Sequence, residues 1–125
     1  MSTKIHDFAN QAILGIGAPP QTATSTVTGT GGDLLGGDSR CFALQMVGTV
    51  AGTSPTLDGK IQESSDNAAW TDIAGATFTQ VTASTNNQAI TFDRSKRYVR
   101  YVGTIGGTSP SFAMAAVISE QKKQV

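Results

Sequence analysis

The chain has 125 residues, enough for one domain with a single hydrophobic core and short for two. Nine Lys and Arg balance nine Asp and Glu, and only 14% of the residues are charged, so net charge attracts the chain neither to nucleic acid nor to an anionic membrane. One cysteine, Cys41, and one histidine, His6, allow no internal disulfide and no Cys/His metal site within the chain.

Residues 1–20 predict an N-terminal arm followed by a hinge. Apolar residues recur three and four positions apart, the spacing of a short amphipathic helix, until glycines and prolines end the pattern at residues 15–20. We therefore expect a short helix or an extended arm, joined by a Pro/Gly hinge to the rest. The apolar side chains of the arm are predicted to contact a partner: Ile5, Phe8, Ile13 and Leu14.

From residue 21 onward apolar and polar residues alternate, β-branched residues are frequent, and turn-forming residues recur at roughly 8–12-residue intervals. This pattern predicts an all-β domain over residues 21–119. The expected architecture is an antiparallel β-sandwich, of which a jelly roll is one form. Residues 120–125 are predicted to be a flexible tail, and Cys41 a small buried hydrophobe.

The clearest alternation lies in residues 42–47. Phe42, Leu44 and Met46 lie on one face of this predicted strand, and the three residues between and after them lie on the other. Residues 57–62 alternate in the same way, and we expect the two segments to pair as a hairpin. Residues 98–105 and 112–118 repeat the pattern and predict a second hairpin.

A nine-residue segment occurs twice, as VGTVAGTSP at residues 47–55 and as VGTIGGTSP at residues 102–110, with seven identities in nine positions. Either the two segments occupy related places in the fold, at one end of the sandwich, or the same loop chemistry is simply used twice. These loops are predicted contact sites through Thr53, Ser54, Pro55, Thr108, Ser109 and Pro110.

The sequence offers little for catalysis. Residues 29–37 are rich in glycine but lack the Lys-Ser/Thr that follows in a phosphate-binding loop, and the only histidine lies in the arm. The carboxylates of residues 58–72 are expected to be solvated or turn residues, not paired acids or calcium ligands. We predict no catalytic residue, no cofactor and no metal.

Four basic residues gather near the C-terminal part of the domain: Arg94, Lys96, Arg97 and Arg100. Basic residues next to aromatic ones are typical of single-strand nucleic-acid binders, but Tyr98 and Tyr101 lie an odd number of residues apart and so on opposite faces of a strand. We expect these cations to pair with acids of the domain or of a neighbouring subunit, and retain them as a basic contact patch.

Trp70, the only tryptophan, allows two interpretations. It could form a stacking platform for a sugar, with Asp66 and Asn67 binding hydroxyls, or it could anchor a turn to the core. We favour the anchor, and the exposure of the indole distinguishes the two.

Three segments carry a resemblance to a known group of proteins: residues 57–73 (LDGKIQESSDNAAWTDI), 97–102 (RYVRYV) and 106–110 (GGTSP). Over residues 22–118 the chain resembles small tailed-bacteriophage head proteins, which are decoration (cement) or minor capsid proteins. The resemblance implies a β-sandwich on the capsid exterior, made in the host cytoplasm.

The same resemblance implies that the chain binds the major capsid protein and copies of itself, as a homotrimer, and neither nucleic acid nor membrane. Two alternatives stay open. One is a carbohydrate-binding module on the virion surface, and the other is a tail or connector component.

Overall fold

The computed structural model of the chain describes residues 12–34 and 37–122, all of which lie in β-strands, turns or loops. The all-β, antiparallel prediction is therefore confirmed. Among these residues no helix has the length and hydrophobicity needed to span a membrane. The strands are β1 (Ala12–Ala23), β2 (Val27–Thr28), β3 (Gly32–Asp33), β4 (Gly37–Ser64), β5 (Thr71–Thr77), β6 (Asn86–Asp93) and β7 (Tyr98–Lys122).

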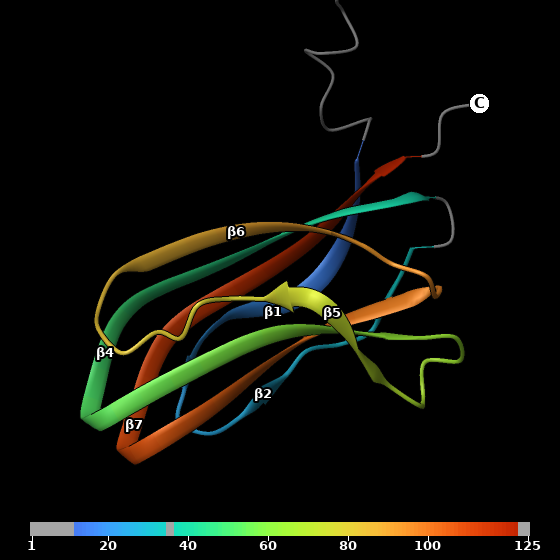
Figure 1. Cartoon of the computed structure of the whole chain (residues 1–125). Helices are drawn as coiled ribbons and strands as arrows, with labels where there is room; N and C mark the ends of the chain where they lie inside the picture. The colour runs from blue at the N-terminus through green and yellow to red at the C-terminus, as the bar shows by residue number, and fades with distance from the viewer. Residues whose placement is uncertain (1–11, 35–36, 123–125) are drawn as a thin grey trace, which may run out of the picture.

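The sheet folds over on itself because its two longest strands bend. β4 and β7 pair antiparallel along most of their length, and each turns a sharp corner, so that the two lie as stacked Vs in Figure 1. Before its corner β4 pairs with the end of β7, and after it β4 pairs with the start of β7. One layer therefore has the order β6, β4, β7, β1, and the other has β5, β4 and β7 with the short β2 and β3 beside β7.

The two corners are the repeated segments. Gly52 and Gly107 have φ of 110° and 111°, and Ser54 and Ser109 have φ of 50° and 48°. Positive φ is easy for glycine and costly for serine, so equal values in both segments indicate one corner conformation formed twice. Strands that change layer at such bends are typical of folded-over sheets.

The corners are also related by an approximate two-fold axis. Thr53 pairs with Thr108, its own equivalent in the repeat. Equivalent pairs lie on either side: Val50 with Phe112, and Ile105 with Leu57. The repeat therefore marks related places in the fold, as the first of the two interpretations expected. The expected hairpins do not form, however, because residues 42–47 and 57–62 each pair with β7 and lie in opposite layers.

The core lies between the layers. Leu57 and Ile61 of the second layer and Phe112 and Ile118 of the first are fully buried, which agrees with the predicted alternation. Cys41 is buried among them, as expected.

Both predicted ends of the domain differ from the structure. β1 begins at Ala12, so residues 12–20 belong to the sheet and not to an arm or hinge, and the domain starts before residue 21. The register of β1 on β7 shifts between Ala18 and Gln21, around Pro19 and Pro20, because proline lacks the N–H that a regular ladder needs. At the other end, residues 120–122 complete β7, where a flexible tail was expected.

Candidate functional site

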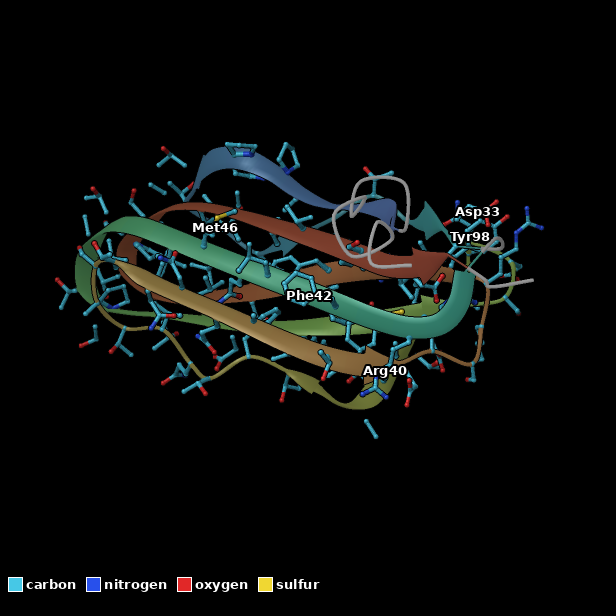
Figure 2. The ribbon with its side chains drawn as sticks, turned by 90° about the horizontal axis from the view of Figure 1, so that it is seen from above. Asp33, Arg40, Phe42, Met46 and Tyr98 are labelled. Carbon is cyan, nitrogen blue, oxygen red and sulfur yellow. The ribbon has the colours of Figure 1, made fainter. Side chains whose placement is uncertain are left out.

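The first half of β4 turns its larger apolar side chains toward solvent. Cys41, Ala43, Gln45 and Val47 are buried between the layers, while Phe42 and Met46 are 41% and 36% exposed and Leu44 is half-buried. Figure 2 shows Phe42 and Met46 on this outward side of the layer, seen from above. The sequence predicted the two faces of this strand but not which of them is buried.

Neighbouring strands extend this apolar surface. Residues opposite one another in an antiparallel pair share a face, so the partners of the β4 residues also point outward. On β7 these partners are half-buried, and on β6 they are exposed. We call this surface the outer face, and it consists of Phe42, Leu44, Met46, Asn87, Ala89, Thr91, Ala115, Val117 and Ser119. All of its residues are uncharged.

The two ends of the outer face differ. At one end Arg40 and Asp93 lie opposite each other on β4 and β6, with Nη1 3.6 Å from Oδ1, and their side chains are 65% and 70% exposed. At the other end the surface is hollowed beside Met46, between β1, β7 and the residues before β6. Thr85 lines this hollow with φ of 58°, a conformation rare for a β-branched residue.

The four basic residues do not form one exposed patch, because two of them are bound to carboxylates of the domain. Arg94 is almost buried and donates from Nε and Nη2 to the two oxygens of Glu120, at 2.6 and 3.1 Å. It also donates to the carbonyl oxygens of Leu34 and Lys96. Cys41 Sγ lies 3.4 Å from the same carboxylate. Arg94 thus fixes the end of β7 against two loops.

Arg97 and Arg100 are held differently. Arg97 donates to both oxygens of Asp33, at 2.9 and 2.7 Å, and these bonds raise the pKa of its guanidinium. Arg100 donates to Gln62 and stacks over the Trp70 ring, 4.4 Å from its centre. Lys96 Nζ lies 3.3 Å from the hydroxyl of Thr71. The expected pairing with acids of the domain is therefore present for Arg94 and Arg97.

Trp70 is half-buried, and Arg100 covers one side of its ring. Asp66, the expected partner for sugar hydroxyls, accepts hydrogen bonds from the backbone N–H groups of Ala68 and Ala69 and from the Ser64 hydroxyl. These bonds, that from Ala69 most strongly, lower the pKa of the Asp66 carboxyl. The arrangement is that of a turn held by hydrogen bonds to Asp66 and anchored by Trp70.

Sequence reasoning missed a buried polar pair in the core. The Tyr101 hydroxyl donates to Gln45 Oε1 at 2.5 Å, and both residues are fully buried. Gln45 Nε2 has no acceptor among the described residues. The signal was present in the sequence, because Gln45 lies on the same strand face as Ala43 and Val47.

The remaining predicted site residues lie apart from the outer face or outside the description. The six corner residues lie at the bends of β4 and β7, whereas Ile13 and Leu14 lie in β1. Ile5 and Phe8 precede the described residues. Within residues 12–34 and 37–122, no three His, Cys, Asp or Glu side chains are placed to share a metal ion. No protein-family model matches the chain, and no curated protein is significantly similar to it.

Proposed function

We propose that this chain is a non-enzymatic structural protein of a tailed-phage virion that decorates the capsid and stabilises it. The proposal rests on the outer face, because an apolar surface on a β-sheet is suited to contact with another protein. Large apolar side chains on a soluble domain mark interaction surfaces when they are contiguous. Arg94 and Glu120, by contrast, are bound to each other within the fold.

Stabilisation of the shell requires only selective binding. A protein that binds the assembled shell and not its separated subunits stabilises the shell by RT ln(1 + [L]/Kd), about 2.7 kcal/mol per site at a hundredfold excess over Kd. The corners, with Thr53 beside Thr108, are the second proposed contact region. The apolar residues of segment 1–14 are the third.

The proposal is tested by the composition and the stability of virions. We expect mass spectrometry of purified particles from the encoding phage to find the chain in many copies. Shells stripped of it should melt at a lower temperature and regain the higher one when purified protein is added back.

The matched variants are Phe42→Ser with Met46→Ser on the outer face, and Thr77→Ala, which is exposed in the other layer. The first pair should reduce the copies retained on the shell, and the Thr77 variant should not. Particles without the chain, or shells whose melting temperature it leaves unchanged, would overturn the proposal.

A further inference from the structure

We infer that the outer face binds the outer face of a second copy of the same chain, forming a two-fold pair. The inference rests on the proposed role as a contact protein and names the partner of that surface. It is carried by the shape and composition of the surface, by its area, and by the charges at one end.

The outer face is uncharged and largely apolar, so no charge on it opposes contact with a second copy of itself. A two-fold interface requires the same patch on both subunits, and the rows of Phe42, Leu44 and Met46 meet that requirement without rearrangement. The whole chain has no net charge, so two copies do not repel each other.

The area is sufficient for a weak dimer. Residues 40–47 of β4 and their partners on β6 and β7 cover a plane of roughly 400 Å², from about 3.4 Å per residue and 4.8 Å between strands. This is about half of the roughly 800 Å² per partner of a standard interface, so we expect a weak and readily reversible dimer.

The charges at one end of the outer face determine how the two copies are oriented. If the two-fold axis runs parallel to the strands above β4, the apolar rows overlap, and the Arg40–Asp93 pairs of both copies meet at the same end. Each Arg40 then has an Asp93 on either side, one from its own copy and one from the partner. In the opposite orientation both pairs would lie over the uncharged hollow beside Met46 and lose solvent without gaining a partner.

Analytical ultracentrifugation of the full-length chain tests the inference without any virion. We expect the mass to rise from one chain to two as the protein concentration is raised. Phe42→Ser with Met46→Ser should raise the dimer Kd about tenfold or more, since the exposed parts of these side chains are covered only in the dimer. Circular dichroism should show that this variant stays folded, and Thr77→Ala should dimerise like the wild type.

Two charge variants test the orientation. In a dimer of Arg40→Asp copies four carboxylates would meet, and in a dimer of Asp93→Arg copies four guanidinium groups would meet. Because these like charges repel, each variant alone should dimerise more weakly than the wild type at low salt. An equimolar mixture should form a heterodimer, because the two copies then have complementary ends. A mixture that associates no better than either variant alone would overturn the proposed pair.

The remaining outcomes separate other occupants of the outer face. Ile5→Ser with Phe8→Ser should leave the dimer intact, and loss of the dimer in that variant would assign the surface to the N-terminal segment instead. A chain that stays monomeric at all concentrations, or a dimer or trimer that survives the Phe42 and Met46 changes, would also overturn the inference. Detection of the chain in virions would still support its proposed function in any of these cases.

Discussion

Replacing Gly107 with alanine should lower the free energy of unfolding by about 2–5 kcal/mol, because alanine meets two separate penalties there. The first is conformational: a φ of 111° costs a residue with a Cβ about 1–2 kcal/mol. The second is steric. A Cβ on Gly107 would lie 2.7 Å from the Ser54 carbonyl oxygen and 2.9 Å from Pro55 Cα. These are backbone atoms that cannot rotate away, and moving them strains the pairing of the two corners, at about 1–3 kcal/mol.

The approximate symmetry makes the prediction stricter. A Cβ on Gly52 would meet the equivalent atoms of the other corner, 2.6 Å from the Ser109 carbonyl oxygen and 2.8 Å from Pro110 Cα. Gly52→Ala should therefore cost the same as Gly107→Ala within about 1 kcal/mol. Gly75→Ala is the control, since Gly75 has φ of 82° and a Cβ added to it would have no described atom within 4 Å. It should cost only the conformational part.

Urea denaturation followed by circular dichroism measures all three variants, and unchanged m-values would show that the comparison is one of stability. If Gly52→Ala and Gly107→Ala cost no more than Gly75→Ala, the close packing of the corners is refuted. If the two corner variants differ by several kcal/mol, the corners are not equivalent and the symmetry argument fails.

The buried polar groups give three more predictions. Tyr101→Phe removes the donor to buried Gln45 and should lower the free energy of unfolding by about 1–3 kcal/mol; adding Gln45→Leu should restore part of that loss, since no amide is then left unpaired. Urea denaturation of the two single variants and the double variant measures the coupling, and additive costs would contradict the hydrogen bond. Arg94→Met leaves the Glu120 carboxylate unpaired in the core and should lower the free energy of unfolding by about 3–5 kcal/mol, more than the same change combined with Glu120→Leu. Thermal melts that rank the two variants equally would show that the pair is not buried together. Burial, and then the charge of Glu120, raise the pKa of the Cys41 thiol far above its usual range. A thiol reagent at mildly alkaline pH should therefore label the protein only as fast as it unfolds, and rapid stoichiometric labelling of the native state would refute the protection of Cys41.

Local patterns were sufficient to predict the strands and part of the core. Alternation has a period of two whatever the partner strand, so the buried row of β7 from Phe112 to Ile118 could be predicted from its spacing alone. The repeat likewise offered related places for the two Gly-Thr-Ser-Pro segments as one of two interpretations, and the structure favours that one. Both inferences depend only on residues close together in the sequence.

Pairing partners could not be predicted in this way. A hairpin over residues 42–62 is the local solution, but β4 pairs with β7, whose partner residues lie from 34 (Ser64 with Tyr98) to 85 (Gly37 with Lys122) positions away. The N-terminal segment is a second example. Its helical spacing predicted an arm, yet from Ala12 the open edge of β7 supplies a ladder of hydrogen bonds, and this tertiary contact outweighs the local preference.

The orientation of β4 shows most clearly how sequence pattern and burial disagree. Shifting its register by one residue would bury Phe42, Leu44 and Met46 and expose Gln45, which for an isolated domain is the better choice. The observed register instead places the smaller side chains of Cys41, Ala43 and Val47 between the layers, in one core with Tyr101 and Phe112. Phe42 and Met46 are 41% and 36% exposed, so each forgoes about 0.5–1.2 kcal/mol of the roughly 1.5–3 kcal/mol that full burial supplies. A second surface laid over the outer face, as in the pair proposed above, would supply that burial, and the exposed row of β4 is the reason for that proposal.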